Sequence, residues 1–426
     1  MRSMLRAVAL IIPFVAAPAL AADAPVTAIR AGHMVDVTTG KVLGDQVIVV
    51  RGDHIEAVGP ANAVQVPAGA KVVDLSGATV LPGLIDTHTH ITSDPTLPPY
   101  HGYGLSYPRV ALKGAANAKV TLLAGVTTIR DVGASGFTDI AVRDAINEGD
   151  IPGPRILASG PALGITGGHC DDNMLAPEFN YESDGVANGV DGVRRLVRRN
   201  VKYGADVIKY CGTGGVFSKG DTPGGQQYTA EEVAALIDEA HMHGRRVAVH
   251  AHGASGIKVA IRAGVDSIEH ASLIDDEGLQ LAKKNGTFLS MDIYNTEYTQ
   301  SEGPKRGELE EFLRKDREVA QAQRDNFRKA VKLGIKLTMG TDAGVYTHGD
   351  NPKQLATMVE YGMTPMQALQ AATITGADLL GLKGKVGELA AGQFADIIAV
   401  PGDPIADIKV MQRVQFVMKG GAIYKQ

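Results

Sequence analysis

The pattern of apolar and polar positions changes twice along the chain, near residue 83 and near residue 385. Before residue 83, short apolar runs such as 47–50 and 55–58 flank turn residues, a pattern typical of β-hairpins. Between about 83 and 385, short apolar runs alternate with segments of helical periodicity. This alternation predicts parallel strands joined by helices. After residue 385, strand-like runs return at 394–400 and 414–418.

The central segment contains eight strand-like runs, and most of them lead directly into a polar residue. The runs lie at 84–85, 127–129, 155–157, 206–208, 246–249, 266–268, 287–289 and 336–339. Eight βα units in about 300 residues are typical of a (β/α)₈ TIM barrel in the α/β class. Thr229 with Glu232 and Thr364 with Gln367 have the spacing of capping boxes at helix starts.

The strand-like flanks are expected to pair into one small β-sandwich domain that is discontinuous in sequence. The predicted organisation is therefore a signal peptide at 1–22, the first part of the small domain at 23–82, the barrel at 83–385, and the second part of the small domain at 386–426.

The N-terminus carries the features of a secretory signal peptide. Arg2 and Arg6 precede an apolar run at 8–15, and Ala19-Leu-Ala21 provides a small-x-small cleavage site. The apolar run is shorter than the 20 or so residues that a membrane anchor needs. We therefore expect a periplasmic or secreted protein without a membrane span.

Composition narrows the range of partners. The 426 residues are 44% hydrophobic and 21% charged, as in ordinary globular proteins, and the formal net charge of −5 makes nucleic acid an unfavourable partner. Cys170 and Cys211 are too few for a disulfide scaffold. An oxidising compartment would allow one bridge between them, and the sequence does not decide whether it forms.

Candidate chemistry begins at Asp86-Thr-His88-Thr-His90, which directly follows an apolar run. Side chains alternate along a strand, so His88 and His90 face the same side and can hold one divalent metal together. Lys209, His250, His270 and Asp342 stand at the ends of later strands. In a barrel these ends meet at one mouth, where active sites lie.

This constellation resembles the amidohydrolase superfamily, in its metal-dependent hydrolase branch. The resemblance covers nearly the whole mature chain and includes imidazolonepropionase-like features. The motifs that carry it are residues 81–90 (LPGLIDTHTH), 208–209 (IK), 249–250 (VH), 268–270 (IEH), 340–342 (GTD) and 391–396 (AGQFAD). Residues 125–131 and the His348-Gly and Asn351-Pro pairs are similar to the Xaa-Pro dipeptidase and carboxypeptidase subgroup, which has ochratoxin-hydrolysing relatives.

The resemblance implies a binuclear centre with two divalent ions, expected to be Zn²⁺. His88 and His90 would bind the more buried ion and His250 and His270 the second, while Asp342 would bind the buried ion and shuttle protons. Lys209 would be N6-carboxylated by CO₂, because a carbamate can bridge two metals whereas an ammonium has no lone pair. The partner would be a small-molecule or dipeptide substrate, and the chain is expected to form a homo-oligomer.

The deaminase branch of the superfamily is the nearest competitor. It holds one metal, lacks the bridging lysine and uses a Glu shortly after the fifth-strand His. Here Lys209 is present and His250 is followed by Ala251-His252-Gly253-Ala254, so the sequence favours two metals and hydrolysis.

The predicted reaction is hydrolysis of an amide bond next to a C-terminal amino acid, in dipeptides, Xaa-Pro or N-acyl and aryl-acyl amino acids such as ochratoxin A. His169, His252, Tyr294 and Tyr298 are predicted to contact the substrate carboxylate from loops at the mouth. A lactonase or cyclic-amide hydrolase on the same site is the alternative enzyme. A non-catalytic metal-binding or substrate-binding protein is the alternative from another class, and Asp342 argues against it because binding alone needs no proton shuttle.

Overall fold

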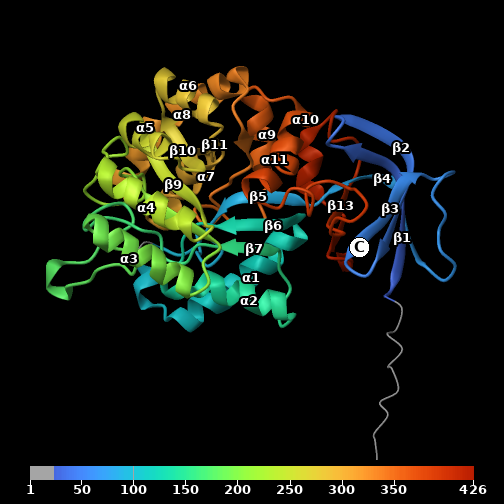
Figure 1. Cartoon of the computed structure of the whole chain (residues 1–426), viewed down its shortest axis with the longest axis horizontal. Helices are drawn as coiled ribbons and strands as arrows, with labels where there is room; N and C mark the ends of the chain where they lie inside the picture. Colours follow the sequence, from blue (N-terminus) through green and yellow to red (C-terminus); the bar gives the residue numbers. More distant parts are fainter. Residues whose placement is uncertain (1–23, 99) are drawn as a thin grey trace, which may run out of the picture.

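The computed structural model describes residues 24–98 and 100–426 of the chain, so the signal peptide predicted at 1–22 lies outside the described residues. Within them, a barrel of parallel strands surrounded by helices adjoins a smaller β-sheet at one end of the molecule (Figure 1). The predicted α/β class with a TIM barrel and a small β domain is confirmed. The exact domain boundaries remain predictions.

The barrel consists of two hydrogen-bonded arcs in the described residues. The strands of the first arc are β5 (Leu84–Thr89), β6 (Val126–Asp131) and β7 (Arg155–Ala158). The strands of the second arc are β8 (Val207–Cys211), β9 (Arg246–Gly253), β10 (Ser267–Leu273), β11 (Phe288–Ser290) and β12 (Leu337–Thr338). Parallel bridges between Leu163 and Tyr210 and between Thr89 and Ala343 join the arcs on their two sides.

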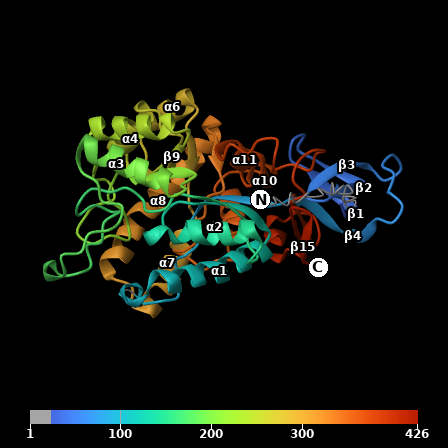
Figure 2. The same cartoon turned by 60° about the horizontal axis from the view of Figure 1, so that its bottom comes forward.

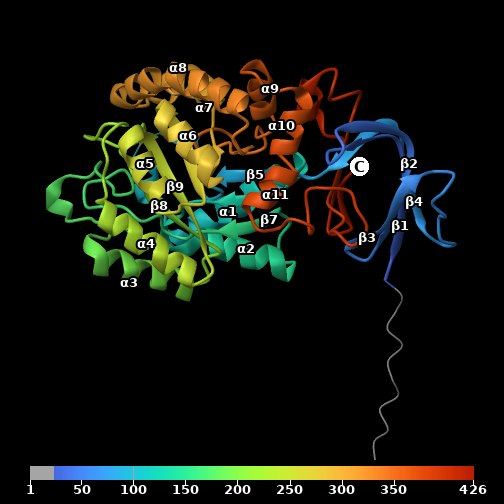
Figure 3. The same ribbon diagram turned by 45° about the horizontal axis from the view of Figure 1, so that its top comes forward.

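Helices cover the outside of the barrel, with α8 along one side in Figure 3 and α3 and α4 side by side in Figures 1 and 2. They are α1 (Tyr107–Leu123), α2 (Thr138–Glu148), α3 (Gly189–Lys202), α4 (Ala230–Met242), α5 (Ala254–Arg262), α6 (Asp276–Asn285), α7 (Asn295–Glu302), α8 (Glu310–Leu333), α9 (Lys353–Glu360), α10 (Pro365–Ala371) and α11 (Ile374–Leu379). Short 3₁₀ turns are η1 (His101–Gly104), η2 (Ser135–Phe137), η3 (Pro177–Phe179), η4 (Pro304–Arg306) and η5 (Ile408–Arg413).

Both predicted capping boxes form. The side chain of Thr229 accepts a hydrogen bond from the Glu232 amide at the start of α4, and Thr364 does the same with Gln367 at the start of α10. In each box the side chain of Glu232 or Gln367 also accepts a hydrogen bond from the backbone amide of the threonine. Two amides at the helix end therefore find partners, and the helix start is fixed.

The small domain is one seven-stranded sheet in the described residues, in the order β15-β14-β13-β4-β1-β2-β3. Its strands are β1 (Val26–Asp36), β2 (Lys41–Arg51), β3 (His54–Pro60), β4 (Lys71–Pro82), β13 (Ile397–Val400), β14 (Phe416–Lys419) and β15 (Ala422–Lys425). Antiparallel pairing of β13 with β4 joins the two ends of the chain, as predicted. The sheet packs on its own apolar cluster, which includes Ile29, Ile48 and Phe416.

The sheet connects to the barrel through β4 and β5, which are separated only by Gly83. A Cβ atom at Gly83 would lie 2.1 Å from Oγ1 of Thr127 on the neighbouring strand. Glycine is therefore required where the chain leaves the small sheet and enters the barrel. This short connection places His88 and His90, at the end of β5 and just beyond it, at the barrel mouth. In the described part of the chain, no helix is long and apolar enough to cross a membrane.

Candidate metal centre and active site

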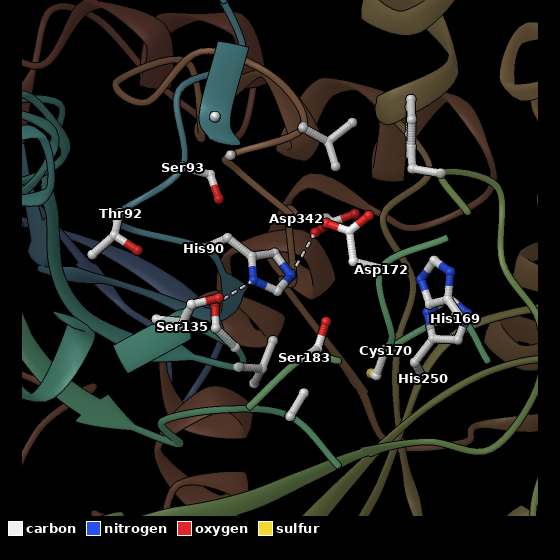
Figure 4. A pocket seen from close by; sticks show the side chains of 18 of the residues that line it. His90, Thr92, Ser93, Ser135, His169, Cys170, Asp172, Ser183, His250 and Asp342 are labelled. Atoms are coloured by element: carbon white, nitrogen blue, oxygen red, sulfur yellow. Dashed lines mark hydrogen bonds and ion pairs between the residues drawn. The ribbon is translucent and has the colours of Figure 1, made fainter. Parts of the chain in front are cut away.

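The structure brings the predicted ligand residues together at the carboxyl ends of the barrel strands. Three groups of side chains have ligand atoms within 4.8 Å of one another. The groups are His88, His90 and Asp342; His270, Asp292 and Asp342; and His250, His252 and His270. Because consecutive groups share Asp342 and then His270, the donors form a continuous series across the mouth. Figure 4 shows His90 directed at Asp342, with His250 and His169 on the other side of the cavity.

The first group, His88, His90 and Asp342, has the features of a cation-binding site. Nε2 of His88 and Nε2 of His90 each lie 3.3 Å from Oδ1 of Asp342. The His88 Nε2 and Asp342 Oδ1 atoms are fully buried, and neither has a hydrogen-bond partner among the residues that the structure describes. Buried polar atoms are normally paired, so converging orphan atoms of ligand type indicate a place for a metal ion.

Electrostatics supports the same conclusion. Burial works against a charged imidazole, yet Asp342 beside it raises the pKa of His88 to about 9. Burial by itself would raise the pKa of Asp342, but the neighbouring His88 holds it well below its usual range. The site therefore favours positive charge between these side chains, which is what a bound divalent cation supplies.

The histidines are oriented by oxygen atoms behind them. Nδ1 of His90 donates to the carbonyl oxygen of Gly133 at 2.9 Å, and Nδ1 of His270 lies 2.9 Å from Oδ1 of Asp292. Nε2 of His250 lies 3.4 Å from the carbonyl oxygen of Gly214. With one ring nitrogen engaged in this way, the other is left for a metal ion, as in most protein metal sites.

Asp292 belongs to one of the three groups, but its oxygen atoms already have partners. Oδ1 accepts from Gln323 at 2.9 Å and faces His270, while Oδ2 accepts from Asn295 at 2.6 Å. Asn295 also donates to Oδ2 of Asp342 at 3.1 Å. We assign Asp292 and Asn295 to the support of His270 and Asp342.

Backbone strain is concentrated at the same place. His270, Ala271 and Asp342 have φ angles of 70°, 50° and 56°, in the left-handed region that non-glycine residues rarely adopt. Such strain persists where the surrounding structure enforces it, commonly at functional sites. Here it lies in the middle of β10 and in the segment after β12, where His270 and Asp342 line the cavity.

Lys209, at the third position of β8, lines the same cavity as His250, His270 and Asp342. Its side chain is buried, and burial lowers the pKa of its amine to about 8. The neutral amine is the form that reacts with CO₂, so this environment fits the carbamate expected from the resemblance.

Sequence reasoning missed the pair Glu269 and Arg130. Both are fully buried, Arg130 donates to Oε1 of Glu269 at 2.7 Å, and Oε2 of Glu269 lies 3.1 Å from Nδ1 of His88. Burial opposes ionisation of Glu269, but Arg130 holds its pKa below the usual range. The available signal was a charged residue at an interior position of each of the two strands, β6 and β10.

The predicted substrate residues divide into two sets. His169 and His252 line the cavity, which has a volume of about 1180 Å³. Nδ1 of His169 lies 2.7 Å from Oγ of Ser218, and Nδ1 of His252 lies 2.8 Å from Oγ of Ser272. His252 also belongs to the ligand group of His250 and His270.

Tyr294 and Tyr298 are not among the residues that line this cavity, and their contact with substrate stays a prediction. Both rings pack on Tyr346: the ring centroid of Tyr294 lies 5.1 Å from that of Tyr346, and the ring centroid of Tyr298 lies 6.1 Å from it. Their position follows from α7, whose first turn presents Asn295 and Thr296 to the cavity instead.

The two cysteines form a disulfide between Cys170 and Cys211, with Cα atoms 5.8 Å apart. Cys211 ends β8, two residues beyond Lys209, and Cys170 follows His169. Both cysteines line the cavity. The bridge therefore attaches the His169 loop to the strand that carries Lys209.

Comparison with known proteins agrees with this geometry. Residues 79–424 match the model of the amidohydrolase family. Ochratoxinase of Aspergillus niger is 33% identical over 434 aligned positions, covering 95% of this chain and 87% of the relative. A crystal structure of a Xaa-Pro dipeptidase with methionine bound in its active site has a TM-score of 0.87 and 39% identity, covering 94% of this chain and 100% of that one. A prolidase complexed with N-methylphosphonate-L-proline has a TM-score of 0.87 and 29% identity, covering 94% and 100%.

Proposed function

The chain belongs to the amidohydrolase family and is a hydrolase acting on amide bonds, and on that premise we propose that it is an exported binuclear enzyme that removes a C-terminal amino acid from a dipeptide or an N-acyl amino acid. The observation that carries the binuclear proposal is the continuous series of ligand groups that share His270 and Asp342. One isolated group would hold one ion, whereas this series offers donors on both sides of Asp342.

The ligand assignment follows from these positions. His88, His90 and Asp342 would hold the more buried ion, and His250 with His270 would hold the second. Lys209, as a carbamate, would lie between them. We propose Zn²⁺ for both positions because imidazole nitrogen and carboxylate oxygen are among its usual ligands in catalytic sites.

When bound, a pair of divalent ions acidifies a water molecule and polarises the scissile carbonyl group. Asp342 is placed to move the proton. Its pKa is held low, so it is ionised and able to accept, and Asn295 fixes its Oδ2 atom from behind. We propose that Asp342 takes up the proton of the attacking water and delivers it to the leaving amine.

Substrate recognition is proposed to use the two histidines that line the cavity. His169 and His252 come from the loop after β7 and from β9, so they approach a ligand from the same side of the mouth. A substrate carboxylate held there would place the amide bond inside it, toward Asp342. The ligands bound in the dipeptidase and prolidase structures, methionine and N-methylphosphonate-L-proline, support a C-terminal amino acid at this position.

The acyl group would occupy the outer part of the cavity. The wall there includes Leu105, Tyr107, Tyr181 and Phe217, which offer apolar and aromatic surface. The cavity is larger than a dipeptide requires, since ligand pockets for drug-sized molecules are about 300–1,000 Å³. Aryl-acyl amino acids, with ochratoxin A as the example suggested by the fungal relative, therefore belong in the first substrate screen.

The proposal includes an oxidising compartment, periplasmic or extracellular. The disulfide between Cys170 and Cys211 supports it, because such bonds persist outside the reducing cytosol. Family resemblance alone supports a homo-oligomer. Fractionation of the producing cells and light scattering of the purified protein test these two parts.

The decisive test compares free and amidated substrates. Zn²⁺-loaded enzyme is screened with Xaa-Pro, Xaa-Phe and aryl-acyl amino acids, each as the free acid and as the carboxamide. We expect the free acids to be cleaved with a much higher kcat/KM. In His252→Ala, with metal content verified, the difference between acid and amide should disappear. Equal cleavage of both forms by the wild type would reject carboxylate recognition and favour a lactonase or cyclic-amide hydrolase.

A further inference from the structure

A buried hydrogen-bonded chain extends from His169 away from the cavity. Oγ of Ser218 lies 2.7 Å from Nδ1 of His169 and donates to Oδ1 of Asp221, also at 2.7 Å. Nζ of Lys315 donates to the same Oδ1 atom at 2.9 Å and to the carbonyl oxygen of Ser218 at 2.6 Å. Lys315 is 1% exposed, so this ion pair lies in the interior. None of Ser218, Asp221 and Lys315 belongs to the metal groups or has a role in the proposed reaction.

We propose that Ser218, Asp221 and Lys315 are positioning residues that fix His169 in one orientation and one tautomer. In this tautomer Nδ1 is protonated and Nε2 is a hydrogen-bond acceptor that faces the substrate, so that within the pair of cavity histidines His252 would be the donor to the substrate carboxylate. The catalytic importance of this relay rests on the proposed function, but its hydrogen-bond pattern does not. The argument is one of proton count. A carboxylate paired with an ammonium can only accept, so the single hydroxyl proton of Ser218 points to Asp221. Nδ1 of His169 must then carry a proton and donate it to Ser218.

The backbone of His169 is held by the same carboxylate. The His169 amide donates to Oε1 of Gln227 at 3.0 Å, and Nε2 of Gln227 donates to Oδ2 of Asp221 at 3.2 Å. Asp221 therefore reaches both the ring and the main chain of His169, each through one intermediate side chain. Such an arrangement removes freedom from a loop residue, which is what a catalytic geometry requires.

Packing against neighbouring residues restricts the His169 ring on its two faces. The His169 ring stacks on His250 with ring centroids 4.0 Å apart. On the other side, a Cβ atom at Gly215 would lie 2.2 Å from Cε1 of His169. The glycine thus makes room for the imidazole. The disulfide at Cys170 anchors the next residue of the loop.

The relay makes a prediction that a purely structural role does not. If Asp221 acts through His169, Asp221→Asn should lower kcat/KM by about 10–100-fold, the range for a hydrogen bond to a charged group. In a His169→Ala background the same change should cost less than about twofold, because coupled residues are non-additive. Ser218→Ala should resemble Asp221→Asn, whereas Ser218→Thr keeps a hydroxyl and should retain most of the activity.

Asp206→Asn is the matched control. The carboxylate of Asp206 accepts hydrogen bonds from the backbone amide of Ala158 at 3.0 Å and from the side chain of Arg143 at 2.6 Å. Asp206 does not line the cavity. We expect it to leave kcat/KM unchanged. Equal losses from Asp221→Asn with and without His169 would overturn the relay. Should Asp221→Asn fail to fold, the comparison of Ser218→Ala with Ser218→Thr decides the same question.

Neutron diffraction of the metal-loaded enzyme reads the tautomer directly. The expected result is a deuteron on Nδ1 of His169 and a Ser218 deuteron directed at Asp221. A ring deuterated only on Nε2, with the Ser218 deuteron directed at His169, would overturn the proposal. This readout is independent of substrate, so it separates failure of the relay from failure of the proposed function, which the absence of wild-type amide hydrolysis would show.

Discussion

Oε2 of Glu269 lies 3.1 Å from Nδ1 of His88, so a buried carboxylate stands directly behind the first predicted metal ligand. Arg130 on β6 donates to the other oxygen of Glu269, and it also donates to the carbonyl oxygen of Thr87 at 2.5 Å. The three strands β5, β6 and β10 are thus connected beneath the site. A carboxylate behind a ligating imidazole sets its orientation and raises its basicity, as in other metal centres.

Glu269→Gln should therefore weaken metal binding by about 10–100-fold, the usual effect of losing such a partner. The amide oxygen of Gln can still accept from Arg130, so the fold should persist. Competition with a chromophoric chelator measures the affinity. Glu239→Gln is the control, because Glu239 is equally buried and paired with Arg194 and Arg198, away from the cavity. Unchanged metal affinity in Glu269→Gln would show that the carboxylate does not act on the metal site.

Metal content should reach two ions per chain. The reason is the linked series of ligand groups, which places donors on both sides of Asp342. Elemental analysis of purified holoprotein, followed by stepwise removal with a chelator, provides the measurement. Full activity at a saturating content of one ion per chain would contradict the binuclear site.

Lys209→Ala should remove most of the activity, because the chain would then lack the carbamate oxygens that are proposed to bridge the two ions. Short carboxylic acids should restore part of it by occupying the vacated space. Lys419→Ala is a suitable control: burial also lowers the pKa of Lys419 to about 8, but this residue lies in the small sheet. Wild-type activity in untreated Lys209→Ala would exclude a bridging role.

Reconstitution of metal-free enzyme should depend on pH through Lys209. Its folded-state pKa is about 8, lowered by burial, so the reactive neutral amine becomes the major form above that pH and the minor form below it. At constant dissolved CO₂ and Zn²⁺, the rate of activation should rise as the pH increases from 7 to about 9, where most of the amine is neutral, and then level off. An amine of ordinary pKa near 10.4 would continue to gain above that pH. A pH-independent rate, or activation without any CO₂, would count against carbamate formation.

Asp342→Asn should lower kcat by about 10²–10⁴-fold, the usual contribution of a general acid–base residue, with a smaller change in KM. The amide side chain can still fill the position beside Asn295 but cannot accept a proton from water. Steady-state kinetics with parallel metal analysis make the test, because Asp342 is also a ligand. An effect confined to KM would remove the proton-transfer role.

The sequence by itself predicted the architecture of this protein and the candidate metal ligands. Alternating strand and helix periodicities specify βα units, and a barrel of such units brings the strand ends to one mouth. His88, His90, Lys209, His250, His270 and Asp342 could therefore be placed together before any contact was known, and the structure places them around one cavity.

Tertiary structure alone decided what supports those residues. Glu269, Arg130 and Asp292 were not identified, because a charged residue inside a strand has no partner that local periodicity can name. Tyr294 and Tyr298 pack on Tyr346, a contact that no local pattern of the sequence indicates. The sequence allowed a bridge between Cys170 and Cys211 without deciding whether it forms, and it gave no sign of the hydrogen-bonded chain from His169 to Lys315. The physical reason is shared: strand and helix periods are local properties of the chain, whereas side-chain direction in loops depends on packing between segments far apart in sequence.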